Sequence, residues 1–423
     1  MSTATRILTA LVAGLLIGIG LSSWAPAAGQ IGLGIADPIG TMWLNGLRMT
    51  IVPLVTALLV TGIGATAQAA RASRLAGRAL VLFLAMLTLS AIIGALVTLG
   101  LLDLFPVGAN ASAALRSAVA SSAPVGEVPP FSQFLTAIVP TNPLNAAAND
   151  AFLPLILFTT VFAFAVTRLP DASRTLITNF FQAIADTMLI VIRWVLWLAP
   201  VGVFALAFVV GNRAGTAAFG ALLHYVTIVA SAGFVIALLS IPLAVFGGRV
   251  SPSAFFRAMP QPFAVALSTQ SSLASLPAML RASEGLGVPV ATSGIVLPLA
   301  VAILRSTGPA MNVAVAIYVA HLFGLVLTPA QIATGVVVAA LTSLGAVSLP
   351  GTISFVSSIA PVALAMGLPI EPLALLVAVE TFPDIMRTLG NVAMDVAVTA
   401  TLGRRGGDAG PPTSSDALLS EAP

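Results

Sequence analysis

Long apolar segments constrain the fold of this chain more than any other feature. A helix that crosses a bilayer needs about 20 predominantly apolar residues, and about eight segments approach or exceed that length. They lie at residues 6–25, 39–65, 78–102, 151–168, 173–198, 218–247, 291–324 and 370–403. Only 7% of the 423 residues are charged, whereas about 25% is typical of a soluble domain. We therefore predict an all-α membrane protein with about eight transmembrane helices.

The first apolar segment has features of a secretory signal. Arg6 precedes an apolar run, and Ala-Pro-Ala-Ala follows at residues 25–28. Many more apolar segments come after it, so we expect a retained first transmembrane helix.

Two further apolar stretches, residues 252–288 and 330–366, are interrupted by small and polar residues. Each contains Ser-Leu-Pro near its centre, at 275–277 and 348–350. Proline and glycine leave backbone groups unpaired, which the hydrocarbon core does not tolerate. We predict two re-entrant helical hairpins, with two ordinary kinked helices as the alternative.

Each predicted hairpin is followed by a spanning helix, 291–324 after the first and 370–403 after the second. One full span separates the hairpins, so they enter the membrane from opposite faces. This order indicates an inverted repeat, an architecture that places the substrate site near the bilayer midplane.

The arginines predict the orientation of the chain. With eight spans, the connections that carry them fall on one side, which the positive-inside rule makes cytoplasmic. These residues are Arg71, Arg74, Arg78, Arg168, Arg174, Arg249, Arg257, Arg404 and Arg405. We expect a cell inner-membrane protein with both termini in the cytoplasm and a disordered tail at 404–423.

The last predicted helix carries most of the chain's polar chemistry on one face. At about 100° per residue, six side chains fall within an arc of roughly 100°. They are Glu380, Asp384, Arg387, Thr388, Asn391 and Asp395. A charge at the bilayer centre costs at least about 2.5–3.5 kcal/mol, so this stripe implies a wet or ligand-filled interior.

Arg387 suggests the chemistry of the ligand, because a planar guanidinium suits carboxylates. A nearby aspartate would hold an ammonium group, so the stripe fits a zwitterionic acid with a second carboxylate. The alternative is an internally neutralised packing network in which Arg387 pairs with Asp384 or Asp395.

The pattern Asp-x-x-Arg-Thr-x-x-Asn-x-x-x-Asp, from Asp384 to Asp395, resembles the eighth-helix motif of the glutamate transporter family. These proteins are dicarboxylate/amino acid:cation symporters. Further resemblances lie in Met49–Val55, Pro140–Pro143, Leu153–Pro154, Ala199–Ala205 and Ser271–Pro277. The likeness extends over nearly the whole chain.

The resemblance implies a homotrimer that works by an elevator mechanism. Residues 1–77 and 103–217 would form the scaffold and trimerisation helices. Residues 78–102 and 218–403, which include both hairpins, would form the moving transport domain.

The resemblance also implies roles for individual residues. Arg387 would bind the distal carboxylate of the substrate, Asp384 its ammonium group and Asn391 its α-carboxylate, with Thr388 in support. The backbone of the two hairpin tips would close over the ligand, at Ser271, Ser272, Leu349 and Gly351. Asp395 matches a sodium ligand of the family, which makes it the candidate metal-binding residue.

The segment from Leu304 to Gly308 departs from the family. It reads Leu-Arg-Ser-Thr-Gly where the family has Asn-Met-Asp-Gly-Thr, so Ser306 replaces an aspartate and Gly308 replaces a threonine. We infer that the ordinary sodium sites are largely dismantled. Arg305 would then place a fixed positive charge beside Asp395; alternatively, it points to a polar cavity elsewhere.

The predicted helix at 78–102 also departs from the family at positions that would bind a cation. Phe83, Met86 and Leu87 stand where relatives often carry hydroxyl groups. Apolar side chains cannot coordinate a hard cation, which needs oxygen ligands.

Protons are the other candidate for the coupling ion, beside sodium. Glu380 is the strongest titratable candidate, because burial disfavours the charged form of a carboxylate. His224 and His321 are weaker candidates, since a lone transmembrane histidine is more often a hydrogen-bonded packing residue. We expect no cofactor.

These observations favour a secondary symporter of acidic amino acids or C4-dicarboxylates, whose partners are a small anionic substrate and the lipid bilayer. A nonenzymatic role is expected, because the chain has two histidines, no cysteine and none of the common hydrolase motifs. The net charge of +3 does not indicate nucleic-acid binding. The alternative is an uncoupled transporter, or a channel or sensor that retains the fold.

Overall fold

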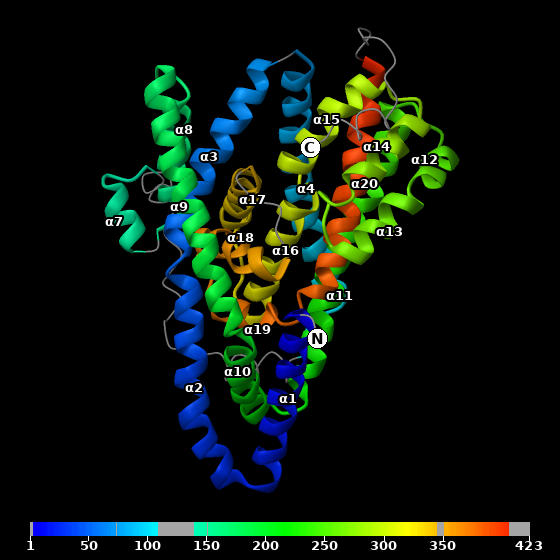
Figure 1. The fold of residues 1–423 in the computed structure, drawn as a ribbon. Helices are drawn as coiled ribbons and strands as arrows, with labels where there is room; N and C mark the ends of the chain where they lie inside the picture. The colour runs from blue at the N-terminus through cyan, green and yellow to red at the C-terminus, as the bar shows by residue number, and fades with distance from the viewer. Residues whose placement is uncertain (1–2, 73, 109–138, 150, 345–350, 406–423) are drawn as a thin grey trace.

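The computed structural model describes residues 3–72, 74–108, 139–149, 151–344 and 351–405, which are almost entirely helical and contain no strand (Figure 1). The helices before the first hairpin are α1 (Thr3–Trp24), α2 (Pro26–Arg48), α3 (Ile51–Ala72), α4 (Arg74–Leu104), α7 (Pro143–Ala148), α8 (Phe152–Val166), α9 (Asp171–Trp197), α10 (Ala199–Ala214), α11 (Ala217–Pro242) and the π-helical turn η1 (Leu243–Gly247). They are followed by α12 (Pro252–Ala258), α13 (Pro260–Thr269), α14 (Leu276–Gly285), α15 (Val290–Ile303), α16 (Thr307–Phe323), α17 (Pro329–Ser343), α18 (Gly351–Ala365), α19 (Glu371–Leu376) and α20 (Thr381–Arg405).

Six helical stretches within the described residues are long and apolar enough to cross a membrane, and they match six of the expected segments. Two expected spans differ from this pattern. The segment at 151–168 forms the 15-residue α8. The segment expected as one span at 370–403 is divided by a turn at 377–380 into α19 and α20, and α20 carries most of the polar face. The second span begins earlier than expected, because Pro26 starts a helical stretch that continues to Gln68.

A close crossing joins α1 to α10. A Cβ on Gly18 would lie 2.4 Å from the carbonyl oxygen of Phe208, and one on Gly14 would lie 2.5 Å from that of Phe204. Only glycine allows the two backbones to approach so closely. The chain therefore holds its first helix against a helix nearly two hundred residues later.

The helices gather into groups that Figure 1 separates clearly. Helices α7 and α8 lie at the left of the view beside α3 and α9, while α12, α13 and α14 lie at the right beside α20. Helix α20 packs against α11, α13, α14 and α15, and α4 packs against α11, α15 and α16. The polar face of α20 is thus surrounded by elements from the second half of the chain and by α4.

The first predicted hairpin is a pair of short helices joined by a turn. Helix α13 ends at Thr269, and Gln270 follows with a left-handed backbone (φ 50°). Helix α14 begins at Leu276, so the Ser-rich segment between them makes the turn. Helices α13 and α14 pack against each other and against α20.

The second predicted hairpin consists of α17 and α18, which also pack against each other. Its base is closed by Gln331, whose side-chain amide donates to the Met366 carbonyl at 2.9 Å. The same side chain completes a capping box with Thr328 at the start of α17. Leu349 lies outside the described residues, and Gly351 is the first residue of α18.

The seventh predicted span is interrupted where the sequence departs from the family. Helix α15 ends at Ile303 and α16 begins at Thr307. The hydroxyl of Ser90 on α4 donates to the Ser306 carbonyl within this break. The interruption therefore presents Arg305 and Ser306 toward α4 and α20 from irregular backbone.

Candidate functional site

The polar face of α20 is buried inside the helix assembly. Glu380 is fully buried and Asp395 is 1% exposed. Asp384, Thr388 and Asn391 are also buried. The predicted stripe is therefore an interior face of the helix assembly.

Arg387 is engaged through all three of its guanidinium nitrogens. Its Nη2 donates to Glu380 Oε1 at 2.9 Å, and its Nη1 donates to Asn312 Oδ1 at 3.1 Å. Its Nε lies 3.5 Å from Asp384 Oδ1. Of the two partners that the packing interpretation proposed, Asp384 is paired with Arg387, and a third carboxylate, Glu380, forms the shorter contact.

Glu380 has a second partner from another helix. The hydroxyl of Tyr225 on α11 donates to Glu380 Oε2 at 3.3 Å. Tyr225 is fully buried, and its ring packs edge-on against Tyr318 of α16 at 5.3 Å between centroids. Glu380 lies in the turn just before α20, and its carboxylate is shared between Arg387 on α20 and a tyrosine on α11.

Asn312 connects the arginine to the second hairpin. Its amide oxygen accepts from Arg387, and its amide nitrogen donates to the Ser358 carbonyl of α18 at 3.3 Å. Asn312 is 3% exposed and lies in the middle of the apolar helix α16. Asn312 therefore joins the guanidinium of Arg387 to α18 of the second predicted hairpin.

Asn391 is bound to the start of α16. Its side-chain oxygen accepts from the Thr307 backbone N–H at 2.9 Å and from the Thr307 hydroxyl at 2.7 Å. A Cβ on Gly390 would lie 2.4 Å from Cγ2 of Thr307. Glycine at position 390 is therefore what allows the broken end of α16 to approach α20.

Asp395 differs from the other acidic residues of the stripe. Among the described residues, neither of its carboxylate oxygens has a hydrogen-bond partner, and the same is true of the Ser306 hydroxyl. Arg305 interacts electrostatically with Asp395 across the helix break. Within the part of the chain that the structure describes, no group of three or more acidic or histidine residues is arranged to hold a metal ion.

The apolar residues that the sequence analysis singled out on α4 pack in an apolar cluster and offer no ligand to a cation. Phe83 and Leu87 are fully buried in an apolar cluster with Leu304, and Met86 packs against it. These side chains contribute packing and no oxygen ligand. A Cβ on Gly308 would make only ordinary contacts, the nearest with Ser343 Oγ at 3.7 Å.

The two serines of the first hairpin, Ser271 and Ser272, form hydrogen bonds within their own turn. Ser271 bonds within its own turn, where its hydroxyl accepts from the Ala274 N–H at 3.3 Å. Ser272 contributes its carbonyl to the same turn, by accepting from the Ser275 N–H at 3.2 Å. The arms of this hairpin pack on α20, but the substrate roles of both serines stay predictions.

The two histidines lie away from the stripe. His224 is hydrogen-bonded at both ring nitrogens, to the Tyr318 hydroxyl at 3.2 Å and to the Phe105 carbonyl at 2.8 Å. His321 interacts electrostatically with His224 and Asp103. His224 therefore bonds as a packing residue does.

Three residues that sequence reasoning did not select complete the site. Tyr225, Thr307 and Asn312 all contact the stripe from other helices. A polar residue in the middle of an apolar helix was the available signal for Asn312. No pattern in the sequence relates Tyr225 to Glu380, which lies 155 residues later.

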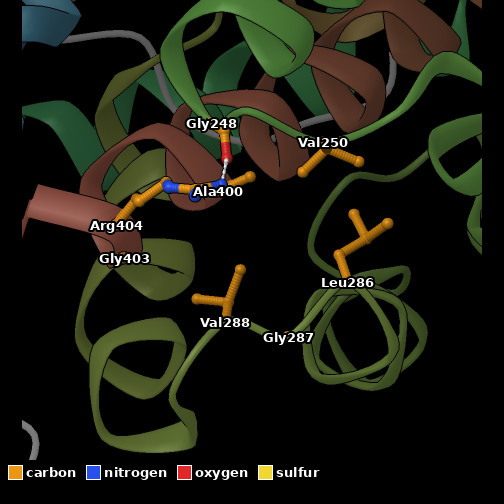
Figure 2. A pocket seen from close by; sticks show the side chains of 8 residues that line it. All are labelled: Gly248, Val250, Leu286, Gly287, Val288, Ala400, Gly403 and Arg404. Atoms are coloured by element: carbon orange, nitrogen blue, oxygen red, sulfur yellow. Dashed lines mark hydrogen bonds between the residues drawn. The ribbon is translucent and has the colours of Figure 1, made fainter.

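Open cavities occur elsewhere in the structure. Figure 2 shows one of about 140 Å³, where Arg404 near the end of α20 donates to the carbonyls of Gly248 and Arg249 at 3.4 and 3.3 Å. Glycine and aliphatic residues form its other walls. This cavity has neither the charge nor the burial of the stripe, so we do not assign the substrate to it.

Comparison with known proteins decides the family. The model of the Sodium:dicarboxylate symporter family matches residues 4–405. The chain belongs to this family.

Three relatives indicate the range of this family. The chain is 28% identical to a proton/glutamate-aspartate symporter of Escherichia coli K12, over 92% of this chain and 90% of the relative. It is 28% identical to a proton/sodium-glutamate symport protein of Bacillus subtilis 168, over 92% and 89%. It is 26% identical to a C4-dicarboxylate transport protein of Leptothrix cholodnii, over 95% and 88%.

Membership of the Sodium:dicarboxylate symporter family confirms several predictions. The chain is a multi-pass inner-membrane transporter of the cation-coupled class, and not an enzyme. Its helical fold agrees with the glutamate transporter fold that the stripe motif indicated.

Proposed function

We propose that this protein is a symporter that carries an acidic amino acid or C4-dicarboxylate across the inner membrane together with a proton. The observation that carries the proposal is Arg387, whose side chain is only 12% exposed and is balanced by Glu380 and Asp384. Burying charge is costly unless it is paired. A site kept at that cost is expected to serve a ligand, and a substrate carboxylate is the natural competitor for Arg387.

Asp384 favours an amino acid over a plain dicarboxylate. It is the weaker of the two acidic contacts of Arg387, at 3.5 Å, so it is the one best able to turn toward a substrate ammonium group. Asn391 would meet the α-carboxylate and Thr388 would support the site. The relatives include both glutamate-aspartate and C4-dicarboxylate transporters.

The helix break favours a proton over sodium. Sodium needs oxygen ligands, and among the described residues Asp395 and Ser306 offer three oxygens that lack hydrogen-bond partners. Arg305 already supplies a positive charge to Asp395, so a cation there would meet repulsion. We infer that Arg305 substitutes for a bound sodium ion and that Glu380 carries the proton. The Escherichia coli relative is named as a proton symporter.

We also propose an elevator mechanism in a homotrimer. Residues 78–102 and 218–403 would move against a scaffold of residues 1–77 and 103–217. The packing of α20 against α11, α13, α14 and α15 supports a common body for the site. The backbone around Ser271, Ser272, Leu349 and Gly351 would close over the substrate.

The test is uptake of labelled aspartate, glutamate and succinate into proteoliposomes under imposed gradients. We expect accumulation driven by an inward proton gradient and indifferent to sodium. Accumulation that requires sodium would contradict the role of Arg305. Absence of uptake under every gradient would overturn the proposed function, and equilibration without accumulation would indicate an uncoupled transporter.

A further inference from the structure

The two oxygens of Glu380 are bound by different helices. Oε1 accepts from Arg387 on α20 at 2.9 Å, and Oε2 accepts from Tyr225 on α11 at 3.3 Å. Among the described residues, the other charged or titratable groups facing this cluster are Asp384 on α20, Arg305 at the helix break and Tyr318 on α16, whose hydroxyl also contacts His224. Tyr225 has no part in the substrate roles described above, although it directly contacts the group proposed to carry the proton.

A substrate that binds at Nη2 of Arg387 would disturb this arrangement. A carboxylate that binds a guanidinium in bidentate fashion takes two parallel N–H groups. The three nitrogens of Arg387 already face Glu380, Asn312 and Asp384. These contacts use three of the five N–H groups of the guanidinium. A substrate carboxylate that takes the Nη2 N–H now donated to Glu380 would release Glu380 Oε1.

A released Glu380 would be a buried carboxylate without its arginine. Such a charge is strongly unfavourable, so release favours uptake of a proton. A protonated carboxyl still needs a hydrogen-bond partner in a buried site. The tyrosine hydroxyl can serve in both states, because it donates one hydrogen bond and accepts others.

We propose that Tyr225 is a positioning residue that holds Glu380 when the substrate displaces it from Arg387, and so links substrate binding to proton uptake. The inference rests on the proposed function. The proton comes from solution and binds Oε1 of Glu380, while Tyr225 keeps its own proton and its contact with Oε2. Both the substrate and this proton leave together on the other side.

The chain offers a matched control, because it contains only two tyrosines. Tyr318 is buried beside Tyr225, and its hydroxyl donates to the Ala221 carbonyl at 2.9 Å rather than to Glu380. Tyr225→Phe and Tyr318→Phe thus remove the same atom from neighbouring rings. Only the first removes a contact to the carboxylate.

The experiment measures aspartate and glutamate binding to the purified full-length protein by calorimetry, at several pH values. Two buffers with different heats of ionisation give the protons taken up per substrate bound. For Tyr225→Phe we expect affinity to fall about tenfold, the size of one lost hydrogen bond to a charged group. We also expect fewer protons per substrate and a shifted pH profile of affinity, with Tyr318→Phe matching the wild type in both.

A second variant separates positioning from folding. Tyr225→His retains a ring donor and is expected to recover part of the proton uptake, whereas a purely structural role would not give this recovery. In a Glu380→Gln background, Tyr225→Phe is expected to have no further effect on proton number.

Two results would overturn this inference and leave the proposed function intact. One is substrate binding by Tyr225→Phe with the proton number and pH profile of the wild type. The other is an equal loss in Tyr318→Phe. If the wild-type protein binds none of these acids at any pH, the proposed function fails, and this inference fails with it.

Discussion

The side-chain oxygen of Asn391 accepts two hydrogen bonds from Thr307, one from the backbone N–H at 2.9 Å and one from the hydroxyl at 2.7 Å. The first N–H groups of a helix have no partner within the helix. Asn391 therefore caps α16 from another helix and joins the irregular segment at Arg305 and Ser306 to the polar face of α20.

Asn391→Leu is expected to leave the Thr307 backbone N–H unpaired in a buried site, whereas the Thr307 hydroxyl keeps the Arg387 carbonyl as its acceptor. Each unsatisfied group costs about 1–3 kcal/mol, so the thermal unfolding midpoint in detergent should fall markedly and substrate affinity should weaken. Thr399→Val is the control, since the Thr399 hydroxyl bonds only to Asp395 O in its own helix. Equal midpoints for the two variants would contradict the proposed capping role.

Arg387→Lys is expected to abolish uptake, because an ammonium group cannot meet three partners in one plane. Breaking a buried pair costs about 3–5 kcal/mol, so the ratio kcat/KM for uptake should fall at least about a hundredfold. Arg48→Lys is the matched change, at a half-exposed arginine paired with Glu371 at 3.2 Å. Exposed pairs contribute about 0–1 kcal/mol, and this variant should transport nearly normally. Substantial uptake by Arg387→Lys would contradict a role for Arg387 in binding the substrate.

Glu380→Gln is expected to uncouple uptake from protons. Glutamine resembles the protonated carboxyl in shape but cannot exchange a proton. The variant should exchange internal for external substrate while failing to accumulate it under a proton gradient, as counterflow assays can measure. Glu371→Gln serves as the control, because Glu371 pairs with Arg48 outside the stripe. Normal proton-driven accumulation by Glu380→Gln would assign the proton elsewhere.

Arg305→Met is expected to change the ion dependence of uptake. Asp395 would lose the positive charge that faces it, and a buried carboxylate without a counter-charge favours binding a cation. Uptake by the variant should therefore become stimulated by sodium. Arg193→Met, at an exposed position on α9, tests for a general effect of charge removal. Ion dependence that is unchanged in Arg305→Met would contradict the substitution of arginine for sodium.

Gly18→Ala is expected to destabilise the protein through the crossing of α1 and α10. Its Cβ would lie 2.4 Å from the Phe208 carbonyl oxygen, so the helices must separate. Gly34→Ala is the same chemical change on α2, where nothing lies within 4 Å of the added atom. Alanine favours helix over glycine by about 1 kcal/mol, so Gly34→Ala should be neutral or stabilising. The comparison is made by thermal unfolding, and a midpoint for Gly18→Ala at or above the wild type would refute the close crossing.

The stripe on α20 was predictable because residues of one helix keep a fixed angular relation. About 100° per residue places Asp384, Arg387 and Asn391 on one face before any tertiary structure is known. Glu380 was expected on the same helix, but it lies in the turn before α20. The interruptions at both hairpins were predictable for a similar reason. Proline and glycine break a helix locally, whatever packs around it.

The partners of the stripe were not predictable in this way. Glu380 meets Tyr225, and Arg387 meets Asn312, only because α11 and α16 pack beside α20. A contact across 155 residues depends on the summed packing of many side chains and leaves no periodic signal in the sequence.

By itself, the sequence determined that this chain has membrane-spanning helices, that its two hairpin segments are interrupted and which face of the last helix is polar. These properties follow from local hydrophobicity and helix geometry. The breaks at 304–306 and 377–380 were not predicted. Only the tertiary structure decided that Glu380 shares Arg387 with Asn312 and Asp384, and that Thr307 is capped by Asn391. The physical reason is that a buried charge must be paired, and its partners are the groups that the packing of the helices brings within hydrogen-bond distance.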